Sequence, residues 1–167
     1  MKIFRKIIMF GLAAALIAGV PANGFADAPA VGKTAPDFAF AIEGAARQKL
    51  SDYRGKPVAL HFWAGWCGPC VRELPLIAEL AASKSGVLTV IAVNCAEPAS
   101  VASSFLAKRK LRMNLALDPD GAISRLYNIN AIPQTFLIDS NGVIRSIQIG
   151  AYTKKTLDAD ISALLSN

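Results

Sequence analysis

The sequence predicts an α/β sandwich built on a sheet of mixed direction. Apolar segments rich in β-branched residues alternate along the chain with amphipathic segments of helical period. One segment, Val58–Trp63, is almost wholly apolar, as is typical of a central parallel strand covered on both faces. Near the C-terminus, Ser140-Asn141-Gly142 separates two strand-like segments and indicates an antiparallel hairpin.

The expected elements follow one another in the order β-β-β-α-β-α-β-α-β-β-α. The first two strands form a short hairpin around Glu43-Gly44, and residues 51–56 form a turn. A helix follows the Cys67–Cys70 turn and runs to about Ser83, with Pro75 inside it. The expected strands are Phe38–Ile42, Gln48–Leu50, Val58–Trp63, Val87–Asn94, Met113–Leu117, Thr135–Asp139 and Val143–Ile149. The other expected helices are Pro98–Lys110, Asp120–Tyr127 and Thr153–Leu165.

Residues 1–26 have the pattern of a secretory signal peptide. Three basic residues precede an uncharged run from Ile7 to Val20, and small residues such as Ala22 and Ala26 follow. As a helix this run would be about 21 Å long, which is shorter than a bilayer core of about 30 Å. We place the cleavage site after Ala26; an uncleaved membrane anchor is the alternative. Either form predicts a periplasmic or otherwise extracytoplasmic protein.

The rest of the chain is predicted to be one domain. Residues 27–36 are rich in Pro and Ala and are expected to be an extended or mobile lead-in, and residues 37–167 form the domain. Removing the signal lowers the formal net charge from +6 to +3, because that segment holds three basic and no acidic residues. A charge this small, spread along the chain, argues against a nucleic-acid partner.

Two cysteines, Cys67 and Cys70, flank Gly68-Pro69 where the buried strand gives way to a helix. Unpaired N–H groups and the helix dipole at a helix N-terminus favour a thiolate, which is the attacking form of cysteine. Cys67 is therefore the predicted nucleophile. Cys70, one turn further in, is predicted to resolve the mixed disulfide. The pair predicts dithiol–disulfide exchange without a metal or organic cofactor.

A zinc site and a structural disulfide are the alternatives for this pair. Zinc normally needs two such pairs, or one pair plus histidines, but the chain has one further cysteine, Cys95, and one histidine, His61. A disulfide between residues three apart closes a very small loop and stabilises the fold little on the loop-entropy model. Redox exchange accounts for the pair better than either alternative.

The residues around the pair resemble those of a known family. Residues 66–70 read WCGPC after Phe62-Trp63-Ala64, which resembles the active site of the thioredoxin superfamily. Four further segments resemble its TlpA/ResA-like branch of exported thiol–disulfide oxidoreductases: residues 32–38 (GKTAPDF), 50–58 (LSDYRGKPV), 70–75 (CVRELP) and 131–139 (AIPQTFLID). The resemblance implies a thioredoxin-like three-layer sandwich, with an N-terminal β-hairpin and a central helix–strand insertion at Pro98–Leu117.

The resemblance also implies a substrate-binding surface and partners. In the family the proline matching Pro133 is cis and faces the disulfide, and the backbone before it, at Ile132, binds the substrate strand. Trp66, Gly68 and Pro69 are expected to complete this surface. The implied partners are protein disulfide substrates, often apocytochrome c among related proteins, and a membrane electron donor that reduces the pair again. The protein is expected to act as a monomer.

Three residues near the pair have open roles. Glu73, three residues after Cys70 on the same helical face, matches an acid that the family places near the thiols; an ordinary surface glutamate is the alternative. His61 stands where plain thioredoxin has a buried acid and TlpA-like chains more often have a small amide. We expect a neutral core histidine there, with proton shuttling as the alternative. Cys95 is expected to end a buried strand and pack as a small hydrophobe; an exposed, dimerising thiol is the alternative.

Two rival functions remain to be tested. A peroxiredoxin shares the fold and the Ala-Pro-Asp-Phe opening, but it needs a peroxidatic cysteine in a P-x-x-x-[ST]-x-x-C setting, which Phe62–Cys67 does not supply. A redox-silent binding module would not need both thiols. An insulin-reduction assay separates such a module from a disulfide reductase.

Overall fold

The computed structural model describes residues 28–41 and 47–166. The predicted signal peptide and the Glu43-Gly44 turn lie outside these residues. Within them, the main sheet has five strands in the order β5-β4-β3-β6-β7. Strands β3, β4 and β5 are parallel, whereas β6 is antiparallel to both β3 and β7. The bounds are β3 Val58–Trp63, β4 Thr89–Cys95, β5 Asn114–Asp118, β6 Gln134–Ile138 and β7 Ile144–Ile149. The predicted mixed sheet with residues 58–63 at its centre is confirmed.

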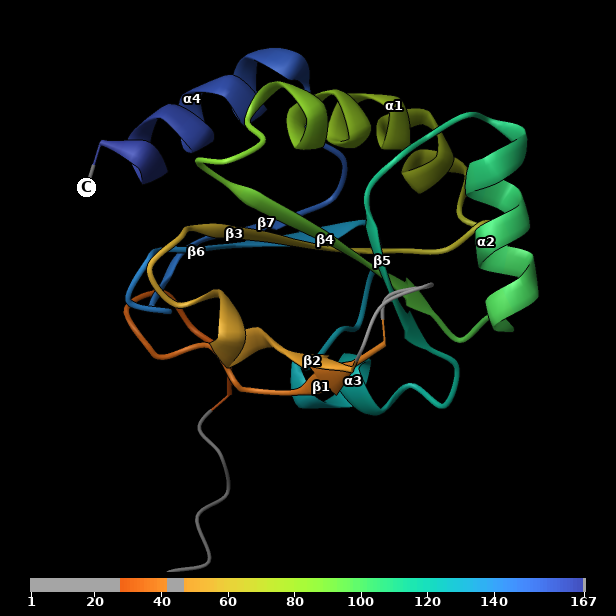
Figure 1. Ribbon diagram of the computed structural model, residues 1–167, viewed down its shortest axis with the longest axis horizontal. Coiled ribbons are helices and arrows are strands. Elements are labelled where there is room, and N and C mark those ends of the chain that lie inside the picture. Colours follow the sequence, from red (N-terminus) through yellow and green to blue (C-terminus); the bar gives the residue numbers. More distant parts are fainter. Residues whose placement is uncertain (1–27, 42–46, 167) are drawn as a thin grey trace, which may run out of the picture.

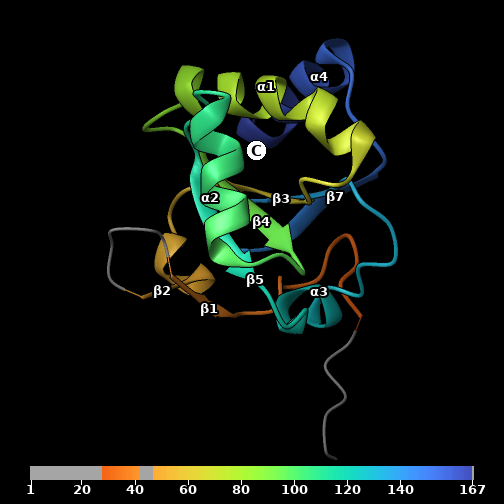
Figure 2. The same ribbon diagram turned by 90° about the vertical axis from the view of Figure 1, so that its right-hand side faces the viewer.

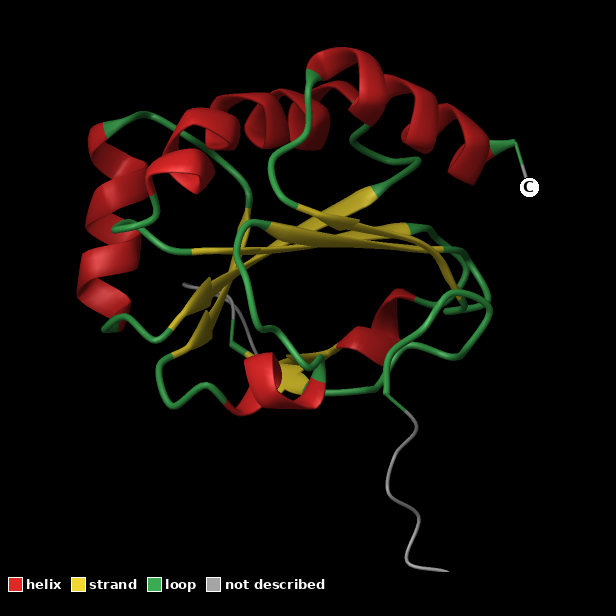
Figure 3. Ribbon diagram, turned by 180° about the vertical axis from the view of Figure 1, so that it is seen from behind, coloured by secondary structure: helices red, strands yellow, loops and turns green. Residues whose placement is uncertain are grey.

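Helices cover both faces of this sheet, which gives three layers (Figures 1 and 3). Helices α1 (Gly68–Ser83) and α4 (Lys154–Leu165) lie on one face of the sheet (Figure 2). Helix α2 (Ala99–Lys108) shares a buried cluster with the first turns of α1. The opposite face carries α3 (Ala122–Leu126), a 3-10 turn (Leu50–Tyr53) and a hairpin of β1 (Ala39–Phe40) and β2 (Gln48–Lys49). In the part of the chain described, no helix is long and apolar enough to cross a membrane.

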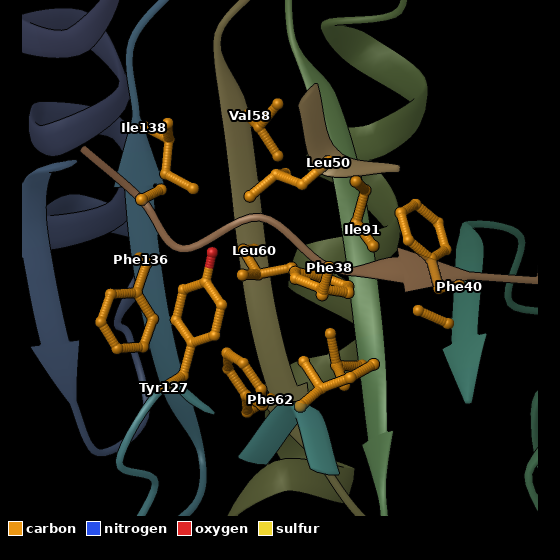
Figure 4. Packing of buried hydrophobic residues seen from close by; sticks show 14 of the residues in the cluster. Phe38, Phe40, Leu50, Val58, Leu60, Phe62, Ile91, Tyr127, Phe136 and Ile138 are labelled. Atoms are coloured by element: carbon orange, nitrogen blue, oxygen red, sulfur yellow. The ribbon is translucent and has the colours of Figure 1, made fainter. Parts of the chain in front are cut away.

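An aromatic cluster fills the space below β3, on the α3 side of the sheet (Figure 4). The ring of Tyr127 lies 5.4 Å from that of Phe62 and 5.0 Å from that of Phe136, centroid to centroid. Its hydroxyl donates a hydrogen bond of 2.7 Å to the carbonyl of Pro36. Burial of three large rings at one place anchors the central strand on this side.

The other face of β3 packs under α1, and the register of this contact positions the cysteine pair. Ala59 belongs to a cluster with Ile77, whereas Trp63 belongs to a cluster with Cys70 and Leu74. The end of β3 therefore lies beneath the start of α1, as a short connection requires. The buried residues of α1 have the spacing of one apolar face of a helix, and Glu73 is the charged exception among them. They are Cys70, Glu73, Leu74, Ile77 and Leu80.

Most predicted elements are confirmed to within one or two residues at each end, but the N-terminal hairpin is an exception. The strand predicted at Phe38–Ile42 is limited to Ala39–Phe40 among the described residues. Leu50, predicted to end a strand, instead begins the 3-10 turn. The reason is local: both carboxyl oxygens of Asp37 accept hydrogen bonds of 2.9 Å from Ser51, from its backbone N–H and its hydroxyl. These bonds favour a turn over continued strand pairing.

The lead-in is held against the β6–β7 hairpin. The N–H groups of Gly32 and Ala35 donate to the carbonyls of Ile144 at 2.8 Å and Gly142 at 2.9 Å. Residues 32–35 of the expected lead-in are therefore hydrogen-bonded to the domain. The partners lie more than 100 residues away, so no local pattern reveals them.

Candidate active site

The Cys67–Cys70 pair lies at the point where β3 leads into α1. In the structure the two cysteines form a disulfide, with their Cα atoms 5.2 Å apart. Cys67 is the N-cap of the 16-residue helix, and its sulfur accepts a hydrogen bond of 3.2 Å from the N–H of Cys70. Pro69 occupies the first helical turn, where a missing N–H costs nothing. The unpaired N–H groups and the helix dipole thus favour negative charge on the Cys67 sulfur.

A groove of about 640 Å³ has Cys67 in its lining. The predicted surface residues Trp66, Gly68, Pro69 and Ile132 all line this groove, and the Trp66 side chain is 68% exposed. Cys67 retains an exposure of 6%, whereas Cys70 is fully buried. An incoming sulfur can therefore reach Cys67 and not Cys70, which fits the predicted division between attacking and resolving thiols.

The Ile132–Pro133 peptide bond, which precedes β6, is cis and lies beside the disulfide. The carbonyl oxygen of Ile132 is 3.7 Å from the Cys67 sulfur. Pro133 itself is buried and lines no part of the groove, and its carbonyl accepts a hydrogen bond of 2.8 Å from Gly150. The backbone at Ile132 is thus the part of this loop that a client strand could meet.

A buried carboxylate fixes the loop between β3 and Cys67. One oxygen of Glu97 accepts hydrogen bonds from the N–H of Gly65 at 2.6 Å and from the side-chain amide of Asn94 at 2.7 Å. A Cβ atom on Gly65 would lie 3.1 Å from Glu97 and 3.2 Å from Phe105, so any larger residue would have to displace these side chains. The sequence analysis did not predict this role of Glu97. Its position just after β4, the strand next to β3, could have indicated it, because the carboxyl ends of parallel strands lie at the same edge of a sheet.

Glu73 lies on the buried side of α1, and this decides against an ordinary surface glutamate. Its exposure is 4%, and its Oε1 accepts a hydrogen bond of 2.8 Å from the backbone N–H of Tyr152. Its Oε2 has no hydrogen-bond partner among the described residues. Burial raises the pKa of Glu73 to about 7, against the smaller opposing effect of the Tyr152 N–H. A carboxyl with such a pKa can both take up and release a proton near neutral pH.

His61 is a fully buried residue of β3, and its side chain is on the α1 side of the sheet. Its Nδ1 lies 2.9 Å from the hydroxyl oxygen of Thr135, its register partner on β6. Burial lowers the pKa of His61 to about 3, so the ring is neutral at physiological pH. This agrees with the expected neutral, hydrogen-bonded core histidine, although Nε2 has no partner among the described residues.

Cys95 is the last residue of β4, 8% exposed, and it lines the same groove as Cys67. Its sulfur lies 3.7 Å from the carbonyl of Val93, and burial raises the pKa of its thiol. A buried thiol of raised pKa is a poor nucleophile. No group of three or more His, Cys, Asp or Glu side chains within the described ranges is arranged to hold a metal ion.

We expect Cys95→Ala to retain insulin-reduction activity within about twofold of wild type, because the thiol takes no part in exchange. The substitution removes one buried sulfur and should cost about 1 kcal/mol of stability. Turnover and urea denaturation of the purified variant measure the two effects. A folded Cys95→Ala protein with a large loss of turnover would contradict the bystander role.

The comparisons with known proteins agree with this geometry. The model of the AhpC/TSA family matches residues 31–147. The thiol–disulfide oxidoreductase ResA of Geobacillus kaustophilus is 37% identical over 166 residues, which cover 97% of this chain and 95% of that protein.

Solved structures show the same similarity. A Chlorobium tepidum protein assigned as thiol:disulfide interchange protein DsbE superposes with a TM-score of 0.77 at 36% identity, over 83% of this chain and 99% of that one. A secreted disulfide oxidoreductase of Mycobacterium tuberculosis gives a TM-score of 0.69 at 25% identity, over 76% of this chain and 96% of that one. The thioredoxin-like fold predicted from the sequence is thereby confirmed.

Proposed function

From the premise that the chain belongs to the AhpC/TSA family and is a thiol–disulfide oxidoreductase similar to ResA, we propose that it reduces disulfides in extracytoplasmic protein substrates. One observation carries the proposal: the sulfur of Cys67 meets a groove at a helix N-terminus, with the Ile132 carbonyl 3.7 Å away. Purified protein should therefore accelerate the reduction of insulin by dithiothreitol. Absence of any acceleration by the folded protein would overturn the proposal.

The exchange proceeds in two balanced steps. The Cys67 thiolate attacks one sulfur of the client disulfide, which forms a mixed disulfide and releases the other client sulfur as a thiolate. Cys70 then loses its proton and attacks the Cys67 sulfur, which closes the Cys67–Cys70 disulfide and releases the second client thiolate. The client gains two electrons and the pair loses them. Glu73, three residues after Cys70 on the buried face of α1, accepts the Cys70 proton.

We also propose how the groove binds a client. A client segment in extended form would lie along Trp66, Gly68 and Pro69 and pair with the free Ile132 carbonyl beside Cys67. Proline at position 133 has no N–H, so the client strand does not have to supply an acceptor for one. The largely hydrocarbon surface of Trp66 and Ile132 favours clients whose cysteines are flanked by apolar residues.

Export and electron supply belong to the same proposal. The N-terminal 26 residues are proposed as the export signal, and the secreted relative from Mycobacterium tuberculosis supports an extracytoplasmic site. A reductant outside the cytoplasm needs electrons from elsewhere, and we propose a membrane carrier that reduces the Cys67–Cys70 disulfide of the monomer. Apocytochrome c, which must be reduced before it binds haem, is the proposed client class.

The reduction potential of the pair tests the direction of electron flow. Gly68-Pro69 between the cysteines is the dipeptide of thioredoxin, whose potential is about −270 mV, whereas DsbA lies at about −120 mV. We expect a value nearer to that of thioredoxin, measured by equilibration with glutathione or dithiothreitol. A potential above about −180 mV, the value for protein disulfide isomerase, would assign an oxidase or isomerase instead.

A peroxidase is the second candidate, because the AhpC/TSA family match includes the segment around Cys67. The motif P-x-x-x-[ST]-x-x-C requires Pro at position 60 and Ser or Thr at position 64, but the chain has Leu60 and Ala64, both buried apolar residues. Position 64 therefore lacks the hydroxyl that the peroxidase motif places there. Hydrogen peroxide consumption by the reduced protein should be no faster than that of a simple thiol. Rapid, saturable consumption would instead favour the peroxidase.

A further inference from the structure

Four buried side-chain atoms lack a hydrogen-bond partner among the described residues, and Trp63 Nε1 and Asn94 Oδ1 are two of them. The other two are Nε2 of His61, whose residue is fully buried, and Oε2 of Glu73, whose residue is 4% exposed. Leaving a buried polar atom unpaired costs about 1–3 kcal/mol, and more for a charged group. Such atoms are therefore usually paired, and buried water is the common partner where two of them share a space.

The register of β3 against α1 places these two atoms in the same interlayer space. On β3, His61 lies between Ala59 and Trp63, on the same face of the strand. On α1, Glu73 lies between Cys70, which shares a cluster with Trp63, and Ile77, which shares a cluster with Ala59. His61 on the strand and Glu73 on the helix thus both lie between the same two clusters.

We propose that one buried water molecule joins His61 Nε2 to Glu73 Oε2, so that His61 is a positioning residue for the carboxyl that serves Cys70. The proposal rests on the exchange function given above and adds a role for the histidine. In the proposed arrangement the Thr135 hydroxyl, 2.9 Å from Nδ1, donates to it, and the proton of the neutral ring is on Nε2. The Nε2–H group then donates to the water, and the water donates to the carboxylate of Glu73.

The surroundings of Glu73 leave this water as the adjustable partner of the carboxyl. The N–H of Tyr152 is a fixed donor to Oε1, and the Tyr152 hydroxyl is turned to Asp160 of α4 at 2.9 Å. On α1 itself the neighbouring titratable group is Cys70, which does not titrate while it is disulfide-bonded. On the sheet the neighbouring titratable group is His61, which stays neutral. In the oxidised protein, Glu73 is therefore the group of this site that changes charge near neutral pH.

The single histidine of the chain makes the test direct. His61 is the only one in the sequence, so its ring ¹⁵N signals need no assignment. In the oxidised protein, Nε2 should carry the proton throughout, and its signal should show an inflection near pH 7 as Glu73 ionises. Glu73→Gln should abolish that inflection. Glu79→Gln, which changes an exposed carboxyl on the same helix, should leave it unchanged and serves as the matched control.

Signals that stay flat in folded wild-type protein between pH 5 and 9 would overturn the proposal. So would an imidazole that protonates near its ordinary value of about 6.5. An inflection that persists in Glu73→Gln would assign the effect to another group and equally overturn it. Each outcome is measured on the wild-type protein, on Glu73→Gln or on Glu79→Gln. The test therefore does not depend on whether a histidine variant folds.

Two histidine variants give an independent measurement. Asn at position 61 keeps a polar atom near the place of Nδ1, whereas Gln keeps one near the place of Nε2. The carboxyl ¹³C signals of the four glutamates report the pKa of Glu73 in each variant. We expect the Glu73 inflection to move up by about one pH unit in His61→Asn and to stay near its wild-type position in His61→Gln. Equal values in both variants would contradict a link through Nε2.

Insulin reduction by the same samples separates this inference from the proposed function. Activity in wild type with flat His61 signals would reject the link and keep the function. Coupled His61 and Glu73 signals in a protein without reductase activity would keep the link as a structural feature and reject its role in exchange.

Discussion

Replacing Cys67 with Ser should reduce insulin reduction to the uncatalysed rate, a loss of about 10³-fold or more. The serine hydroxyl at the start of α1 does not ionise at neutral pH, so the helix N-terminus has no anion to stabilise. The geometry allows no replacement: Cys70 is fully buried, and Cys95 has a raised pKa. Turnover with insulin and dithiothreitol measures the effect.

Cys70→Ser is the matched variant, because it retains the attacking thiol and removes only the resolving one. It should accumulate mixed disulfides between Cys67 and client cysteines, visible as an adduct by non-reducing electrophoresis and mass spectrometry. Substantial turnover by Cys67→Ser, or adducts that form through Cys95, would show that the nucleophile has been assigned to the wrong residue.

The fold and the cysteine pair could be predicted because their determinants are local. The apolar segment Val58–Trp63 can be satisfied only by burial on both faces, and the structure buries all six of its residues. The pair's place at a helix start follows from Gly68-Pro69 directly after that strand. The Ser140-Asn141-Gly142 turn also acts locally, since Gly142 adopts a φ of 75° that favours glycine.

Other parts of the site depend on contacts between distant segments. Glu97 reaches Gly65 across 32 positions, and Glu73 meets Tyr152 across 79. Helical spacing puts Glu73 on the face of Cys70, but only the packing of α1 against the sheet and α4 determines that its carboxyl is buried. A sequence pattern predicts on which face of a helix a residue lies, but not how polar the residues are that pack against that face. The raised pKa of Glu73 therefore could not be predicted.

Glu73→Gln should make the oxidised protein more stable above pH 7 by about 3 kcal/mol, while the two proteins are almost equally stable near pH 4.5. The pKa of Glu73 rises from 4.5 to about 7 on folding, so the folded state binds the proton more tightly. The wild-type carboxyl therefore loses its favourable protonated state as the pH rises through this window, whereas the amide does not change. Urea denaturation at several pH values between 4.5 and 8.5 gives the difference directly.

The same substitution should slow insulin turnover near neutral pH by about 100-fold, because the amide cannot accept the Cys70 proton. It should also move the pH profile of thiol alkylation to lower pH, since a nearby carboxylate disfavours the thiolate; only the combined titration of the pair can be compared. Glu79→Gln is the control and should change neither stability nor turnover, because its carboxyl is exposed. A variant that is more stable but slower would show that the buried carboxyl serves the chemistry at the expense of the fold. A variant with wild-type turnover and an unchanged stability profile would place the proton acceptor elsewhere.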